Sequence, residues 1–291
     1  MRPCQLIIDS GSTKMEWVLL EPSGKTQTFI TEGFNPNYSH PDKLNALIEE
    51  IFPSVSAPSN FSIHYYGSGC GTEKNRKIVK EMFQTKFPEA QVEVTHDLMA
   101  AVHATLGYRP GIACILGTGA NACLYDGKEI VAKPVSLGYL VGDEGSGCYI
   151  GRKLIRAYFY HLMPDDLAQQ FEAFYHPDVS DFIERVYHNP EASKYLADFT
   201  HFAGEHKEHP FIQSLVRQCF SDFKDVFIEP FPNSHHLPVT FVGSIAYHFQ
   251  DILIPFLKEE GFLPDIIMQK PMDGLIEFYK NIDVNSAGDN H

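Results

Sequence analysis

The stretch that decides the fold of this chain lies near its start and reads Ile7-Ile8-Asp9-Ser10-Gly11-Ser12-Thr13-Lys14. An apolar run typical of a β-strand ends in an acid, and a small, hydroxyl-rich turn follows. Such a turn exposes backbone N–H groups with little side-chain bulk, which suits a phosphate. Asp9 is an oxygen ligand of the kind that Mg²⁺ prefers. Many hairpins contain Ser and Gly for turn chemistry alone, so this interpretation needs support from the rest of the chain.

Composition and charge limit the classes of protein. The chain has 291 residues, of which 44% are hydrophobic and 21% charged, so a sizeable core and about two domains are expected. The net charge of −14 argues against a broad surface for nucleic acid or anionic membrane. It does not exclude an anionic substrate, because a local site can oppose the global charge.

Cysteine usage and hydropathy indicate a compartment. The six cysteines are scattered and contain no Cys-x-x-Cys pair, so we expect reduced, mostly buried thiols rather than disulfides or a zinc site. The start of the chain has no signal-peptide pattern, and no run of about 18 apolar residues occurs. These patterns predict a cytoplasmic protein without a membrane partner.

The order of elements in the first half of the chain is β-β-β-α-β-α with a second strand and helix. The helix after the third strand has Ser39 as a plausible cap and Pro41 in its first turn. The predicted strands are 4–9, 15–20, 26–31, 61–66 and 91–95, and the predicted helices are 41–52, 73–87 and 97–106.

The same order restarts after residue 110. The predicted strands are 111–116, 121–125, 129–135, 238–242 and 263–268, with helices at 244–258 and 271–281 and a helical insertion over about 146–230. The repetition predicts two similar α/β domains whose sheets are covered by helices. We expect domains at 1–107 and 108–270, with a final helix, 271–285, packing back on the first. Facing glycine turns predict a cleft between the domains.

Three motifs resemble those of a known superfamily. The turn after Asp9, the run Leu116-Gly117-Thr118-Gly119-Ala120-Asn121 and the run Val242-Gly243-Ser244-Ile245-Ala246 resemble the two phosphate motifs and the adenosine motif of actin-like ATPases, which include sugar kinases, Hsp70 and actin. The run Gly138-Tyr-Leu-Val-Gly-Asp-Glu-Gly-Ser-Gly147 resembles the GDEGS segment of N-acetylglucosamine kinases and the related BadF/BadG/BcrA/BcrD ATPases. The resemblance covers nearly the whole chain and implies two ribonuclease H-like domains with an interdomain cleft.

The resemblance also implies ATP with Mg²⁺ as cofactors. No GxxxxGK[ST] loop occurs, so two hairpins would hold the phosphates instead of a helix N-terminus. Asp9 is the candidate metal ligand. The candidate nucleotide residues are Ser10, Gly11, Ser12, Thr13, Lys14, Gly117, Thr118, Gly119, Gly243 and Ser244. An ordinary strand-to-helix turn also explains Gly243.

Asp97 is the candidate catalytic base. It follows a predicted strand and opens a predicted helix, and helix capping by itself would explain an Asp there. It also resembles the catalytic aspartate of the superfamily's sugar kinases, and the two roles are compatible. As a base it would accept the proton of a sugar hydroxyl that attacks the γ-phosphate.

The resemblance assigns further residues to the sugar. Asn35 matches the family's sugar-binding asparagine and Asp143 its sugar-binding aspartate, while turn formation is the alternative for Asn35. Other members often carry Trp where this chain has Tyr139, which puts the identity of the substrate in question. For Glu144, a metal or sugar contact and helix capping remain open. The candidate substrate residues are Asn35, Ser68, Asp97, Gly138, Tyr139 and Asp143.

Three functions follow as hypotheses. The first is an ATP-dependent kinase of an N-acetylated amino sugar, with N-acetylglucosamine 6-phosphate as product and a homodimer as a family-level expectation. The second is an ATPase activator of the benzoyl-CoA reductase type, for which Cys148 would need a second cluster ligand that the sequence does not supply. The third is a non-catalytic sugar or nucleotide sensor.

Overall fold

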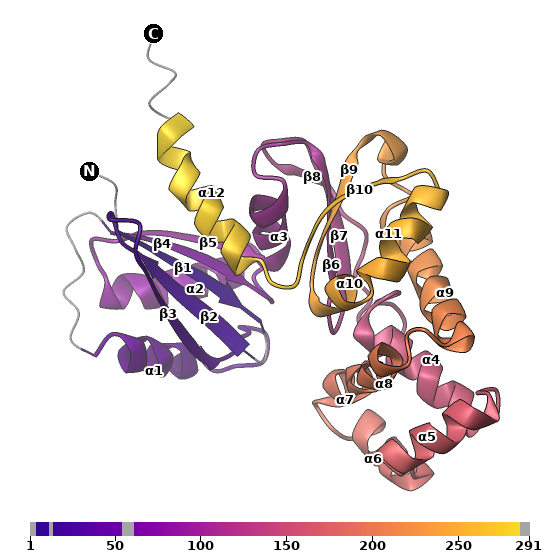
Figure 1. Ribbon diagram of the computed structural model, residues 1–291. Coiled ribbons are helices and arrows are strands. Elements are labelled where there is room, and N and C mark those ends of the chain that lie inside the picture. The colour runs from indigo at the N-terminus through magenta and orange to yellow at the C-terminus, as the bar shows by residue number, and fades with distance from the viewer. Residues whose placement is uncertain (1–3, 12–13, 54–60, 286–291) are drawn as a thin grey trace. The chain divides into compact units, whose positions relative to one another are not determined.

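The chain divides into two compact units, residues 1–107 with 271–291, and residues 108–270. A computed structural model describes residues 4–11, 14–53 and 61–285, with side chains to Asn281 (Figure 1). Within these residues no helix is long and apolar enough to cross a bilayer. All six cysteines are unpaired and buried, which confirms the expectation of buried thiols.

The first unit is built on a five-stranded sheet in the order β3-β2-β1-β4-β5 (Figure 1). Its strands are β1 (Cys4–Ser10), β2 (Lys14–Leu20), β3 (Thr26–Glu32), β4 (Phe61–Gly67) and β5 (Gln91–His96), and its helices are α1 (Pro41–Ile51), α2 (Glu73–Lys86), α3 (Asp97–Thr105) and α12 (Met272–Asn285). Alternate β1 residues Leu6 and Ile8 pack with α1 and α2 in one core, while α3 and α12 pack against each other and against β1. Successive side chains of a strand point to opposite faces, so the apolar run of β1 predicts a strand covered on both.

The second unit repeats this topology. Its sheet has the order β10-β9-β6-β7-β8, which matches the first sheet strand for strand. Its strands are β6 (Gly111–Leu116), β7 (Ala120–Tyr125), β8 (Ile130–Ala132), β9 (Pro238–Val242) and β10 (Leu263–Met268). Its helices are α4 (Gly147–Phe159), α5 (Asp165–Tyr175), α6 (Val179–Tyr187), α7 (Ala192–Asp198), α8 (Thr200–Glu205), α9 (Pro210–Phe227), a 3₁₀ turn (Ser234–His236), α10 (Ser244–His248) and α11 (Gln250–Glu259). The duplicated α/β architecture is therefore confirmed.

Local details differ from the sequence-based prediction. The predicted helix 244–258 is two helices, because Phe249 leaves helical geometry with φ −108° and ψ 22°. The strand predicted at 129–135 covers only Ile130–Ala132. The cap of α1 is His40, whose Nδ1 accepts from the Asp42 N–H, and not Ser39. The other two differences lie at element ends, where boundaries are least well defined, whereas the break at Phe249 falls inside the predicted helix.

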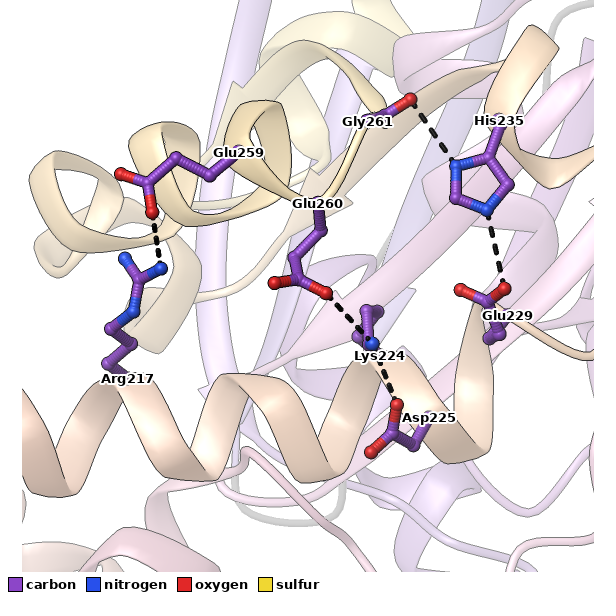
Figure 2. Close-up of polar contacts among 8 residues, drawn as sticks. All are labelled: Arg217, Lys224, Asp225, Glu229, His235, Glu259, Glu260 and Gly261. Carbon is purple, nitrogen blue, oxygen red and sulfur yellow. Dashed lines mark hydrogen bonds and ion pairs between the residues drawn. The ribbon is translucent and has the colours of Figure 1, made fainter.

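Polar contacts join α9 to α11 in the second unit, as Figure 2 shows. Arg217 pairs with Glu259, and Lys224 contacts Glu260, the residue after α11, at 3.1 Å and its own neighbour Asp225 in α9 at 2.8 Å. Exposed ion pairs each contribute less than about 1 kcal/mol, so they orient this layer more than they stabilise it. The stabilisation comes from fully buried apolar side chains of both helices, including Phe220, Phe223, Leu253 and Leu257.

The C-terminal helix α12 is fixed to α3 by close approach and by a polar cluster. A Cβ on Gly274 would lie 2.3 Å from the Ala104 carbonyl oxygen, so only glycine allows this distance. The Tyr66 hydroxyl contacts His103 Nδ1 and the Tyr279 hydroxyl, each at 2.6 Å. The His103 ring also stacks on Phe278. The packing of α12 therefore fixes the position of α3, the helix that begins with Asp97.

His103 makes the stability of this contact depend on pH. Burial lowers its pKa from 6.5 to about 4, with Glu93 opposing and His64 adding to the shift. Between these values the unfolded chain binds a proton that the folded chain does not, so the contribution is complete above pH 6.5 and is lost as pH falls through 4. The loss amounts to about 3 kcal/mol of unfolding free energy.

We expect His103→Gln to flatten this dependence, because glutamine can bond Tyr66 but does not titrate. Urea unfolding at pH 7, 5.5 and 4.5 measures it, with the exposed His188→Gln as control. Equal slopes of unfolding free energy against pH in wild type and His103→Gln would contradict the assignment.

Candidate functional site

Four strands of the first unit end at the same edge of its sheet. Strands β1, β4 and β5 are parallel, and β3 runs in the same direction because two antiparallel pairings separate it from β1. Ligands of such sheets bind beyond the carboxyl ends of the strands. The residues that leave this edge are those predicted from sequence in this half: Gly11, Asn35, Ser68 and Asp97.

The end of β1 organises this edge. The Ser10 hydroxyl is buried and donates to the Phe34 carbonyl oxygen at 3.0 Å, and the Ser10 carbonyl accepts from the Ser68 N–H at 2.9 Å. Ser10 therefore holds the loop after β3 through its side chain and the loop after β4 through its main-chain carbonyl. Gly11 closes the hairpin through its N–H, which donates to the Lys14 carbonyl at 3.0 Å. Of the other predicted residues, Lys14 is exposed, Asp9 is half-buried, and Ser12 and Thr13 lie outside the described residues.

Asp97 is half-buried at the first position of α3. The cap position belongs to His96, which makes no side-chain capping bond, so the expectation that Asp97 is the cap residue is wrong. Its Oδ1 accepts from the Leu98 N–H at 2.9 Å. A carboxylate in the first turn is also favoured by the helix dipole. Burial, followed by the charge of Asp97, raises the pKa of Cys70 to about 12, so this neighbouring thiol stays protonated.

An open cavity of about 720 Å³ lies within the second unit at the equivalent edge. Strands β6, β9 and β10 are parallel there, and the residues that follow them, Gly117 with Thr118, Ser244 and Gln269, all line the cavity. The structure thus brings the second phosphate motif and the adenosine motif together. The volume lies in the range of small-molecule sites.

The start of α4 holds the hairpin of the second phosphate motif. The N–H groups of Gly147 and Cys148 donate to the carbonyls of Gly117 and Thr118 at 2.8 and 3.1 Å. Ser146 caps α4 by accepting from the Tyr149 N–H at 3.2 Å. The Thr118 side chain is exposed, so its hydroxyl remains accessible from the cavity.

Asp143 lies against the same hairpin. A Cβ added to Gly119 would be 3.1 Å from Asp143 Oδ2, and the Ala120 N–H donates to the carboxylate. Burial is the largest of the effects that raise the Asp143 pKa, and Glu144 adds to it, while the Ala120 bond and Arg152 oppose it. Asp143 also has a positive φ of 55°. The contact between Asp143 and the sugar stays a prediction. The contact between Asp143 and the hairpin was not predicted from the sequence.

The segment before Asp143 is a compact turn. The Gly138 carbonyl accepts from the Gly142 N–H at 2.9 Å, and Arg152 donates to the carbonyl of Tyr139 at 2.7 Å. The Tyr139 side chain packs against a small buried cluster that includes Cys148. Cys148 is itself buried, and its thiol donates to the Ser193 carbonyl at 2.9 Å. A buried, bonded thiol is poorly placed to ligate a cluster shared between subunits, which weakens the ATPase-activator hypothesis.

Two groups of residues escaped the sequence-based prediction. Cavity-lining residues of the helical insertion, such as Lys194, His201 and Lys207, belong to helices and a turn without a recognisable motif. Asn37 and Asn75 contact the loops around Asn35. The Asn-Pro-Asn spacing at 35–37 was a usable signal for Asn37, whereas nothing local identifies Asn75.

Known proteins resemble this chain in sequence and in structure. No family model matches it. An N-acetylmuramic acid/N-acetylglucosamine kinase from Clostridium acetobutylicum is 27% identical over 158 residues, which are 52% of this chain and 51% of the relative. The chain therefore spans about half the length of the curated relative that it matches.

Solved structures extend the similarity over nearly the whole chain. A candidate N-acetylglucosamine kinase from Porphyromonas gingivalis is 35% identical with a TM-score of 0.87, covering 96% of this chain and 99% of that one. A second candidate N-acetylglucosamine kinase, from Chromobacterium violaceum, has the same coverage and a TM-score of 0.73 at 18% identity, which shows the fold alone. Together with the duplicated sheets and their motifs, the first of these matches shows that the chain belongs to the N-acetylglucosamine kinase-like family of the actin-like ATPase fold.

Proposed function

We propose that this protein transfers the γ-phosphate of ATP to an N-acetylated amino sugar and forms the 6-phosphate of N-acetylglucosamine. The observation that carries the proposal is the placement of Asp97, Asn35 and Ser68 at one sheet edge in a chain of this family. The names of the relatives from Clostridium acetobutylicum and Porphyromonas gingivalis support the choice of sugar.

Asp97 would act as the general base. As the sugar hydroxyl oxygen attacks the γ-phosphorus, its proton passes to the Asp97 carboxylate and ADP leaves. Such a base contributes about 10²–10⁴-fold, and positioning with charge stabilisation supplies most of the rest. The bond from the Leu98 N–H to Oδ1 holds the carboxylate in one orientation before substrate binds.

The cavity of the second unit would take the nucleotide. The exposed Thr118 hydroxyl would donate to a phosphate, and Ser244 and Ile245 of the predicted adenosine motif line the same cavity. Gly243 supports this use because its lack of a side chain lets the turn lie directly on Leu116. In this arrangement, donors of the hairpin would bind the phosphates in place of the helix N-terminus that a P-loop provides.

Asp9 suits a magnesium ion. Its carboxylate is a half-buried oxygen donor at the end of β1, next to the predicted phosphate turn. Mg²⁺ keeps several waters and is held by one or two carboxylates with substrate phosphates, so a single protein ligand is enough. When bound, the ion would neutralise developing charge on the phosphates.

Coupled ADP release with a sugar panel tests the proposal. The panel contains N-acetylglucosamine, N-acetylmannosamine, N-acetylmuramic acid, glucosamine and glucose, each with ATP and Mg²⁺. We expect turnover with N-acetylglucosamine and little with glucosamine or glucose, because a site that bonds an acetamido group rejects analogues without it by large factors. Sugar binding without turnover would instead identify a sensor, and ATP hydrolysis that no sugar stimulates would favour an ATPase activator.

N-Acetylmuramic acid is the second candidate substrate. The name of the Clostridium acetobutylicum relative includes it beside N-acetylglucosamine. A higher kcat/KM for N-acetylmuramic acid in the same panel would move the assignment to that sugar, and ³¹P and ¹³C NMR of the product identifies the phosphorylated hydroxyl in either case.

A further inference from the structure

A partly buried amide network in the first unit reaches Asn35 from helix α2. Asn75 Nδ2 donates to Asn37 Oδ1 at 2.8 Å and to the Gly69 carbonyl at 2.7 Å. The Asn37 N–H in turn donates to Asn35 Oδ1 at 3.0 Å. Asn75 and Asn35 are each only 8% exposed, whereas Asn37, which links them, is exposed. One side chain of α2 therefore joins the loop that carries Asn35 to the loop that carries Ser68.

The chemistry of Asn75 matches its two acceptors. It lies in the first turn of α2, where its own N–H donates to the Thr72 cap hydroxyl at 3.3 Å. A side-chain amide has two N–H donors, and here both acceptors are carbonyl oxygens of neighbouring loops. A carboxylate of the same size would be equally at home in a first helical turn but would offer acceptors only. The two acceptors in the neighbouring loops therefore explain why an amide occupies this position, and the helical turn does not.

Gly69 limits Asn35 from the other side. Its φ is +81°, and a Cβ there would lie 2.1 Å from Asn35 Oδ1. The Asn35 amide therefore occupies the space that a side chain at position 69 would fill. The Asn37 bond and the Gly69 backbone together define where the Asn35 amide lies.

We propose that Asn75 is a positioning residue for the sugar, acting through Asn37 on Asn35. The inference rests on the proposed function, in which Asn35 contacts the sugar. A side chain held in one place before binding does not lose that freedom when the ligand arrives, so the network contributes to affinity for the sugar. Among the described residues, those that line the cavity proposed for the nucleotide belong to the second unit, whereas Asn75 lies in the first, so the affinity for ATP should not change.

The variant Asn75→Asp tests the network with little change in shape. It introduces an acid, which suits the first helical turn, but removes the amide donors to Asn37 Oδ1 and the Gly69 carbonyl. Loss of a partly buried hydrogen bond of this kind corresponds to about a tenfold rise in KM for the sugar. We expect that rise with KM for ATP unchanged and kcat within about threefold of wild type. Lys74→Ala, an exposed neighbour in the same turn, is the control and should change none of these values.

A second variant guards against a folding defect. Asn37 is exposed, so Asn37→Ala should fold normally while it removes the acceptor that links Asn75 to the loop. We expect the same selective rise in KM for the sugar. Thermal melts by circular dichroism report the folded fraction of each variant.

A double-mutant cycle with Asn35→Ala decides between outcomes. If Asn75 acts through Asn35, the two changes are non-additive and Asn75→Asp adds little once Asn35 is alanine. Additive effects, or a normal sugar KM in Asn75→Asp while Asn35→Ala raises it, would overturn the positioning role. A normal sugar KM in Asn35→Ala would instead contradict the proposed sugar contact itself.

Discussion

Replacing Asp97 with asparagine lowers kcat by about 10²–10⁴-fold in the expected result, because the amide cannot accept the proton of the attacking hydroxyl. The change is nearly isosteric, and an asparagine Oδ1 can still accept from the Leu98 N–H, so α3 should begin as before. KM for the sugar should change little, since binding contacts are retained. Coupled ADP release at saturating sugar and ATP measures the effect.

Asp42→Asn is the matched control for Asp97→Asn. Asp42 is also an acid in the first turn of a first-unit helix, but it is exposed on α1. We expect its kcat to equal that of wild type. If Asp97→Asn retained more than about a tenth of wild-type kcat, Asp97 would not be the base, and its bond to the Leu98 N–H in the first turn of α3 would remain its role.

Replacing Gly243 with alanine should strongly destabilise the second unit. Gly243 has φ 132° and ψ 155°, a region that only glycine adopts readily, and an added Cβ would lie 2.2 Å from the Leu116 carbonyl oxygen. Backbone strain alone costs about 1–3 kcal/mol, and the contact with main-chain atoms adds to it. We expect the free energy of unfolding to fall by at least about 3 kcal/mol, measured by urea denaturation.

Gly204→Ala tests whether the effect is specific to position 243. Gly204 lines the same cavity, but an added Cβ would meet nothing within 4 Å, and its helix α8 favours alanine. Its stability should therefore be unchanged or slightly higher. Calorimetric titration with a non-hydrolysable ATP analogue should show weakened binding only for Gly243→Ala. Normal stability and normal nucleotide binding in that variant would contradict the strand-to-helix turn described for Gly243.

The sequence predicted the layers of both units because the relevant signals are local. The apolar run that ends at Ser10 and the glycine turn after Leu116 determine where strands end. Parallel strands of one sheet have their carboxyl ends at the same edge. The order of strands and helices along the chain was therefore enough to predict that Asn35, Ser68 and Asp97 lie at one edge. Boundaries were less predictable, as at Phe249, because one residue leaving helical geometry depends on its packing.

Only the tertiary structure decided how individual polar side chains are used. The sequence by itself determined which residue types follow the strands, since strand periodicity and turn chemistry act within a few residues. It could not show that the Ser10 hydroxyl is used by Phe34, that Asp143 lies against Gly119, or that Asn75 reaches Asn37. These partners are 24 to 38 positions apart along the chain, and a hydrogen bond forms only where folding brings donor and acceptor to within about 3 Å.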